Sequence, residues 1–170
     1  MMGDGAMHCQ RPHFPTSPGH SPVTTGRHPQ QIDSPGFETS IRVRYAETDK
    51  MGVVYYANYF VWFEIGRTDL CRQCGFVYRD MELVDNAYLM VVDATCSYKR
   101  PARYDDDLVI RTRVARFAKR TVRFDYEIVD AASRELLAQG TTAHVVTTSD
   151  GRPRSFPERQ ALLVTARLNP

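Results

Sequence analysis

The sequence has no long uninterrupted hydrophobic segment and almost no excess charge of either sign. Among its 170 residues the longest apolar stretches are broken by Asp, Glu or Arg, so none approaches the length of a membrane-spanning helix. The N-terminus lacks the contiguous apolar segment of a secretory signal, and we therefore expect a cytoplasmic protein. A formal net charge of +2 gives no electrostatic reason to expect nucleic-acid binding.

Histidine and cysteine are both scarce in the part of the chain after residue 37, where apolar residues are regularly spaced. Four of the five histidines lie in the first 37 residues, at His8, His13, His20 and His28. A hydrolase of the Ser-His-Asp or Cys-His type would have to use His144, which we interpret as a strand histidine satisfied by its neighbours. No G-x-S-x-G motif is present. Cys71 and Cys74 form a C-x-x-C with no second pair and no nearby His, which favours buried helix cysteines over a redox or metal pair.

The first 37 residues differ in composition from the rest of the chain. They hold six of the ten prolines and five of the ten glycines, and aromatic and β-branched residues are sparse. Such a segment buries too little apolar surface to offset its ordering entropy. We therefore predict a disordered extension over residues 1–37 and one folded domain over residues 38–170.

The ordered pattern predicts one helix followed by four strands. Apolar and charged residues alternate from Ile41 to Tyr45, which predicts a strand, and an apolar stretch from Ala57 to Cys74 predicts a buried helix that ends at Gly75. Further strands are predicted over residues 88–99, 107–117, 121–130 and 135–148. Residues after Gly151 show little pattern. This order predicts an α+β fold in which an antiparallel sheet curls around one long central helix.

The segment YAETDKMGVVYYANYF, from Tyr45 to Phe60, places carboxylates just before the predicted helix. Asp49 in such a position is often no more than a helix cap, although it lies far upstream of Ala57 for that role. With no imidazole system or metal-ligand cluster available, a carboxylate acting alone as nucleophile or general base is the remaining catalyst for acyl chemistry. Its helper would be a backbone N–H at the helix start, near Tyr56 or Ala57.

The segment RVRYAETDKMGVVYYANYFVWFE resembles the active-site signature of the 4-hydroxybenzoyl-CoA thioesterase family, whose members have the hot-dog fold. The shared elements are Thr48-Asp49, Gly52-Val53-Val54-Tyr55 and Asn58-Tyr59, and the resemblance extends over about residues 41–157. It implies acyl-CoA thioester hydrolysis with Asp49 as the catalytic carboxylate and the Tyr56 N–H polarising the carbonyl. Coenzyme A is then part of the substrate, and neither a cofactor nor a metal is expected. Related thioesterases of the Tol–Pal gene cluster type carry His where this chain has Tyr56.

The resemblance also implies a basic site for the phosphates of coenzyme A. Lys119 and Arg120 resemble the family's phosphate-contacting pair, and Arg152 or Arg154 could join them. A basic hairpin on a solvated surface explains Lys119 and Arg120 equally well. On the helix, Glu64 is a second candidate acid, and its spacing to Arg67 favours an ion pair within the helix.

The resemblance further implies homodimers or homotetramers with active sites at the subunit interface. Two other functions fit the same fold. A hot-dog hydratase or dehydratase would need a His beside an acid in the ordered domain, where His144 is a poor candidate. A non-catalytic acyl-CoA sensor would usually need an attached DNA-binding helix pair, and the Pro- and Gly-rich extension does not favour one. The residues do not reveal whether the acyl group is short, long or aromatic.

Overall fold

The computed structural model describes residues 36–168, and the proposed N-terminal extension lies outside the described residues apart from Gly36 and Phe37. The elements in chain order are β1 (Phe37–Arg42), the 3-10 turn η1 (Tyr45–Glu47), α1 (Asn58–Gln73), α2 (Tyr78–Asp85), β2 (Tyr88–Tyr98), β3 (Asp107–Phe117), β4 (Thr121–Asp130), β5 (Leu136–Thr147) and α3 (Glu158–Leu168). No helix within these residues is long and apolar enough to cross a membrane.

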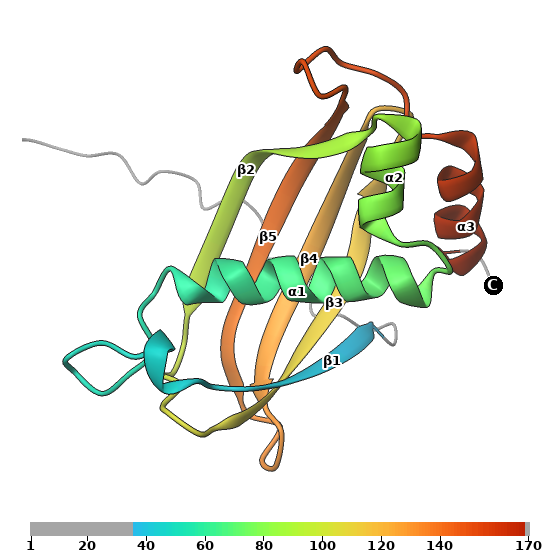
Figure 1. Ribbon diagram of the computed structural model, residues 1–170. Helices are drawn as coiled ribbons and strands as arrows, with labels where there is room; N and C mark the ends of the chain where they lie inside the picture. The colour runs from blue at the N-terminus through green and yellow to red at the C-terminus, as the bar shows by residue number, and fades with distance from the viewer. Residues whose placement is uncertain (1–35, 169–170) are drawn as a thin grey trace, which may run out of the picture.

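The five strands form one antiparallel sheet in the order β1-β3-β4-β5-β2. Figure 1 shows α1 lying across one face of this sheet, with α2 and α3 near the C-terminal end of α1. The α+β class and the sheet wrapped around a central helix, as in the hot-dog fold, are therefore confirmed. The predicted bounds of β3 and β4 are the observed ones, whereas β2 is one residue shorter than predicted and β5 is one residue shorter at each end.

The core lies between α1 and the sheet. Phe63 of α1 stacks on Tyr126 of β4 with ring centroids 4.4 Å apart, and Trp62 and Leu70 are each 1% exposed. Along β4 the residues Val122, Phe124, Tyr126 and Ile128 all face this core, as their alternation predicts. Gly66 lets the helix approach the sheet, because a Cβ there would lie 2.4 Å from Oγ1 of Thr112 in β3.

Two sequence-based expectations about the helices are wrong. The predicted helix α1 is not buried all round: Tyr59, Trp62, Phe63, Gly66 and Leu70 form one buried face, whereas Val61 is 45% exposed and Glu64 is exposed. The segments after Gly75 and after Gly151 also contain helices that no pattern predicted. α2 buries only Met81 fully, and α3 buries Gln160 and Val164, so both depend on tertiary contacts rather than on a strong local signal.

Candidate active site

The loop between β1 and α1 forms a small closed turn that begins at Asp49. Thr48 pairs with Val54, the Asp49 N–H donates to the Val53 carbonyl at 2.9 Å, and the Gly52 N–H donates to the Asp49 carbonyl at 3.0 Å. Gly52 has a φ of 72°, a backbone angle that glycine adopts without strain. The Asp49 side chain is exposed, and its Oδ1 accepts one hydrogen bond, from the Met51 N–H at 2.7 Å.

Asp49 does not cap α1. The helix begins at Asn58, its N-cap is Ala57, and no side chain within residues 36–168 supplies a cap hydrogen bond. The capping interpretation is therefore wrong, and the N–H groups of Asn58 and Phe60 instead bond to the backbone carbonyls of Tyr55 and Ala57. These amides lie at the positive end of the helix dipole, where they favour negative charge.

The N–H of Tyr56 points out of the helix start. The Tyr55 carbonyl accepts a hydrogen bond from the Asn58 N–H at 2.9 Å and therefore faces into the first turn. Because a trans peptide holds C=O and N–H in opposite directions, the Tyr56 N–H of the same peptide is directed away from the helix. Among the described residues, no acceptor is found for a hydrogen bond from the Tyr56 N–H. Tyr98 fixes the next peptide by donating its hydroxyl to the Tyr56 carbonyl at 3.1 Å.

A cleft of about 270 Å³ opens beside this amide. Tyr56 and Tyr59 of the helix start line it together with Tyr98, Lys99 and Arg100 from the end of β2 and beyond. The exposed carboxylate of Asp49 and the outward N–H of Tyr56 thus belong to one short segment next to an open cleft. A carboxylate and an oxyanion donor are the two parts that carboxylate-dependent acyl transfer needs.

Glu47 is a buried anchor for the loop, which sequence reasoning did not assign. Its carboxylate accepts from the Arg44 N–H at 2.8 Å, from the Arg44 guanidinium at 2.9 Å and from the Trp62 indole N–H at 3.1 Å. Burial raises the pKa of Glu47, but these hydrogen bonds outweigh it and hold the pKa below its usual value. Its backbone carbonyl accepts from the Tyr55 N–H and the Asn58 side chain, so Glu47 ties the loop to α1.

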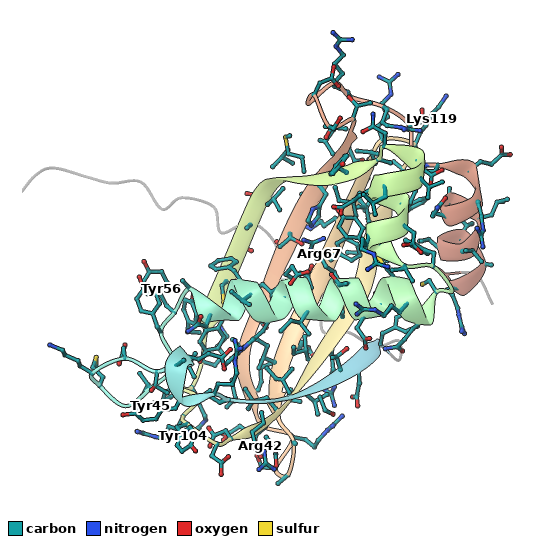
Figure 2. All side chains as sticks on the ribbon, in the orientation of Figure 1. Arg42, Tyr45, Tyr56, Arg67, Tyr104 and Lys119 are labelled. Carbon is teal, nitrogen blue, oxygen red and sulfur yellow. The ribbon has the colours of Figure 1, made fainter. Side chains whose placement is uncertain are left out.

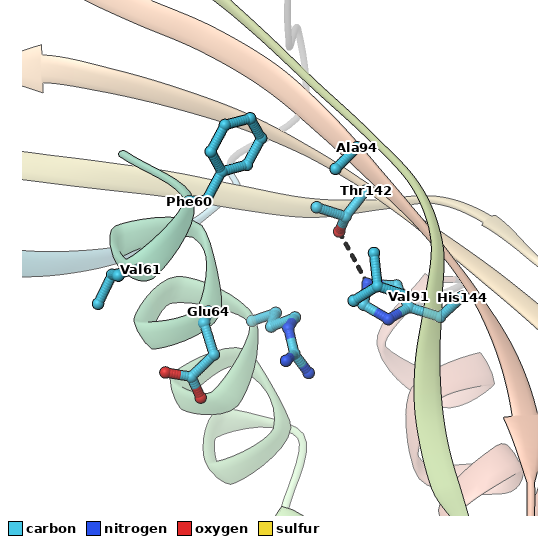
Figure 3. A pocket seen from close by; sticks show the side chains of 8 residues that line it. Phe60, Val61, Glu64, Val91, Ala94, Thr142 and His144 are labelled. Carbon is cyan, nitrogen blue, oxygen red and sulfur yellow. Dashed lines mark hydrogen bonds between the residues drawn. The ribbon is translucent and has the colours of Figure 1, made fainter. Parts of the chain in front are cut away.

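Glu64 and Arg67 do not form the predicted ion pair. Glu64 instead accepts a hydrogen bond from the Thr68 hydroxyl at 2.7 Å, while the Arg67 guanidinium lies 5.6 Å from the centre of the Tyr78 ring. Both line a second cavity of about 470 Å³ between α1 and the strands β2 and β5 (Figure 3). Glu64 lies two turns along α1 from Tyr56, so the second candidate acid sits beside a different cavity.

His144 lines the same cavity and is satisfied by its neighbours, as predicted. It is 1% exposed, with Nε2 2.8 Å from the Thr142 hydroxyl and Nδ1 3.3 Å from the Leu89 carbonyl oxygen. Burial, together with the charge of Arg67, lowers the pKa of His144 to about 4. The ring is therefore a neutral structural group at physiological pH.

The four basic residues proposed for phosphate binding gather at one end of the sheet. The backbone carbonyl of Arg120 and the backbone N–H of Arg154 both bond to Val146. Arg152 pairs with Asp150 at 3.1 Å, and Arg154 donates to the Asp85 and Asn86 carbonyls. Figure 2 shows Lys119 and Tyr56 toward opposite ends of the molecule, so one protomer does not bring this basic end and its own Tyr56 amide together.

The C-x-x-C cysteines are free and buried within α1 and its cap. Cys71 and Cys74 are 4% and 5% exposed, and both are free thiols. Burial raises the pKa of the Cys71 thiol to about 12, so it remains a protonated, unreactive group. This agrees with the interpretation of the two residues as small apolar side chains.

Comparison with known proteins shows which family the chain belongs to. The profile described as Thioesterase superfamily matches residues 51–137, more than half of the chain. The "Putative acyl-CoA thioesterase YneP" of Bacillus subtilis is 43% identical over 117 residues, which cover 68% of this chain and 83% of that protein. The acyl-CoA thioester hydrolase YbgC of Escherichia coli is 30% identical over 122 residues, covering 72% and 90%.

Solved structures agree with the sequence comparison. A DHNA-CoA thioesterase from Staphylococcus aureus superposes with a TM-score of 0.71 at 34% identity, over 78% of this chain and 91% of that one. The 4-hydroxybenzoyl-CoA thioesterase structure, at 19% identity and a TM-score of 0.70, shares the fold. The relatives by sequence are of the YneP and YbgC type. The chain belongs to the thioesterase superfamily.

Proposed function

We propose that this protein hydrolyses acyl-CoA thioesters, with Asp49 as the catalytic carboxylate and the Tyr56 N–H as the oxyanion donor. The observation that carries the proposal is the pairing of an exposed carboxylate with an unpartnered, outward-directed amide on one loop at the start of α1. The names of the YneP and YbgC relatives support the same reaction. Because the amide is held by the fold before substrate arrives, it needs no reorganisation when charge develops on the carbonyl oxygen.

The chemistry can follow two routes from the same parts. In the first, an Asp49 oxygen attacks the thioester carbon, the tetrahedral oxyanion rests on the Tyr56 N–H, and collapse expels the CoA thiolate. Water then hydrolyses the resulting mixed anhydride and frees Asp49. In the second, Asp49 takes a proton from a water molecule that attacks the carbon directly. Both routes yield a carboxylic acid and the CoA thiol, and the good thiolate leaving group requires no strong general acid.

A second copy of the chain completes the site in this proposal. β2 is an edge strand, and its centre is exposed, with Val91 51% and Val92 59% exposed. Unpaired edge strands favour pairing with another strand, and an antiparallel pair related by a two-fold axis sets the start of one β2 beside the end of the other. The start of β2 adjoins the basic end, through the contact of Arg154 with Asp85 and Asn86, and its last residue, Tyr98, contacts Tyr56.

This pairing would bring the basic end of one protomer next to the Tyr56 amide of its partner. Lys119 and Arg120, with help from Arg152 or Arg154, would then bind the CoA phosphates of a thioester held at the partner's loop. The separation of the two regions within one protomer is the reason to place the site between subunits. A homodimer is the smallest assembly with this property, and a homotetramer contains it twice.

The hydratase and sensor alternatives have less support. A hydratase needs a histidine free to exchange protons, and both ring nitrogens of His144 are engaged. A non-catalytic binding module would not need an exposed carboxylate on the same loop as an oriented, unpartnered amide.

The decisive experiment compares wild type with Asp49→Asn and Asp49→Ala on a panel of acyl-CoAs, with the released thiol measured. Loss of the carboxylate should lower kcat/KM by roughly 10²- to 10⁴-fold, the usual contribution of a positioned acid or base. The melting temperature should not change, because Asp49 is exposed and accepts a single local hydrogen bond. Asp80→Asn, a change of an exposed carboxylate in α2, is the matched control. Variants as fast as wild type would refute the role of Asp49.

A further inference from the structure

The cavity beneath α1 has an apolar wall and a single cation. Phe60 and Val61 of α1 face Val91 and Ala94 of β2 across a volume of about 470 Å³, and Arg67 lines the same space (Figure 3). A pocket that is mostly apolar with a few polar or charged groups, here Glu64 and Arg67, is the usual form of a site for a small organic group. The charge at Arg67 therefore calls for a specific account.

Arg67 has no carboxylate partner among residues 36–168. It is half-buried, and its one described contact is with the face of the Tyr78 ring. Glu64, the nearest acid along the helix, is bonded to Thr68, and Figure 3 shows its carboxylate turned away from Thr142 and His144. A guanidinium held partly out of water without a counter-ion is costly unless a ligand supplies acceptor atoms.

The other polar groups of the cavity are already paired with one another. The Leu89 carbonyl can only accept, so the His144 Nδ1 carries the proton and Nε2 accepts from the Thr142 hydroxyl. The Thr142 oxygen then accepts from the Tyr126 hydroxyl at 2.8 Å. This series of hydrogen bonds uses every side-chain donor of His144, Thr142 and Tyr126. Among the described residues that line the cavity, the Arg67 guanidinium is the donor left for a ligand.

Arg67 and the proposed reaction centre are aligned along one helix. Phe60 lies one turn after Tyr56, and Arg67 lies eleven residues after Tyr56, which is roughly 16 Å at 1.5 Å per residue. Helical side chains lean toward the N-terminus, which brings the guanidinium nearer to Tyr56. An acyl group with its carbonyl at the Tyr56 N–H would have to leave the cleft lined by Tyr56 and run along α1, past Phe60, to place its far end toward Arg67 in the second cavity.

We infer that Arg67 selects acyl groups whose far end carries an acceptor oxygen, an anionic carboxylate above all. The inference rests on the proposed thioesterase function and names its substrate class, which is an ω-carboxyacyl-CoA. The methylene or ring portion packs against the apolar wall, and the terminal oxygens accept hydrogen bonds from the guanidinium fork.

The test compares substrates of matched length on matched variants. Wild type is assayed with suberyl-CoA against octanoyl-CoA, and kcat and KM are separated. We expect kcat/KM to favour suberyl over octanoyl by about ten- to a hundred-fold, the value of one charged hydrogen-bonded contact. Arg67→Met should abolish this ratio and Arg67→Lys should retain part of it. Arg72→Met, an exposed change on the same helix outside this cavity, should leave the ratio unchanged.

Binding separates failure of the inference from failure of the proposed function. Titration of uncleaved suberyl-CoA and octanoyl-CoA into Asp49→Asn measures the same preference without turnover. If Asp49-dependent hydrolysis occurs but neither rate nor Kd favours the carboxyacyl substrate, the inference is overturned and the proposed function stands. If no substrate is cleaved, the proposed function fails, and the Kd ratio still decides whether Arg67 selects. Dissociation of the oligomer by Arg67→Met with an unchanged ratio would assign Arg67 to a subunit contact and overturn the inference.

Discussion

The two ends of α1 differ in whether their terminal backbone N–H and C=O groups are capped. At the N-terminal end no side chain caps the helix, the Tyr56 N–H is directed outward, and Tyr56 itself is 59% exposed. At the C-terminal end the Gly75 N–H bonds to the Arg72 carbonyl at 2.9 Å and the Phe76 N–H bonds to the Cys71 carbonyl at 3.1 Å. This is the hydrogen-bond pattern of a Schellman cap, completed by the positive φ of Gly75.

The two ends of α1 therefore differ in role: the C-terminal end contributes to stability, and the N-terminal end contributes to the proposed chemistry. The C-terminal end is closed by α3, where the Leu163 side chain lies beside Gly75 and Arg167 donates to the Gln73 carbonyl at 3.2 Å. Changes there should alter unfolding without altering turnover. The open end keeps donors available for an oxyanion, and changes there should alter turnover. One pH change and two substitutions, in order of decreasing effect, test whether stability and turnover respond separately at the two ends of α1.

His144, under the middle of α1, should produce the largest effect on stability. Its pKa of about 4 in the folded state lies below the ordinary 6.5. Between these two pH values the unfolded chain therefore binds a proton on this ring and the folded chain does not. The free energy of unfolding is then fully retained above pH 6.5 and falls by about 3 kcal/mol as the pH drops from 6.5 to 4. Urea unfolding at intervals across this range measures the slope.

His144→Gln is the matched control for that slope. A Gln can still donate to the Leu89 carbonyl and accept from Thr142, but it does not titrate. The variant should therefore lose the pH dependence between 6.5 and 4 while remaining folded. An equal slope in wild type and variant would show that other groups cause the acid sensitivity.

Features with a local cause were predictable from the sequence, and features with a distant cause were not. The cap at Gly75 follows from glycine conformation, and the bounds of β4 follow from its alternation of apolar and polar residues. The burial of Glu47 depends on Trp62, fifteen residues further along the chain, so nothing near Glu47 distinguishes it from Asp49. Arg67 was assigned to Glu64 by spacing alone, and that failed because Thr68 holds the Glu64 carboxylate.

Helices α2 and α3 were missed for the same physical reason. α2 has eight residues, and such a short helix is not stable by itself in water. Its one fully buried residue, Met81, packs against the rest of the fold, so the signal for the helix lies outside its own sequence. The chemistry of the candidate site was predictable in part, because the turn with Gly52 is local. The opening of the cavity at Arg67 depends on the arrangement of α1 against β2 and β5 and was not.

Glu47 should be the exception to the division between the two ends. It lies in the loop at the open end, yet its buried carboxylate joins Arg44 to Trp62. Glu47→Gln removes the charge and leaves a donor facing donors, which should lower the free energy of unfolding by about 2 kcal/mol. Its pKa is below the usual value, so its stabilisation is present above pH 4.5 and is lost as the pH falls through the lower, folded-state pKa.

Denaturant unfolding of Glu47→Gln beside Asp49→Asn tests this assignment directly. The two carboxylates lie two residues apart, and only the buried one should affect the unfolding midpoint. A Glu47→Gln midpoint equal to that of wild type would mean that the hydrogen bonds to Trp62 and Arg44 contribute no net stability.

Gly75→Ala should give the smallest effect and tests the closed end by itself. With φ at 94°, an alanine at this position would be strained, although the nearest atom to its Cβ, in the Leu163 side chain, is 3.8 Å away. The cost is therefore conformational rather than steric, about 1 kcal/mol of unfolding free energy. Thermal unfolding measures it, and kcat/KM on an acyl-CoA should equal that of wild type, since the Tyr56 amide lies at the opposite end of α1. A loss of turnover larger than the loss of folded protein would show that the two ends are coupled.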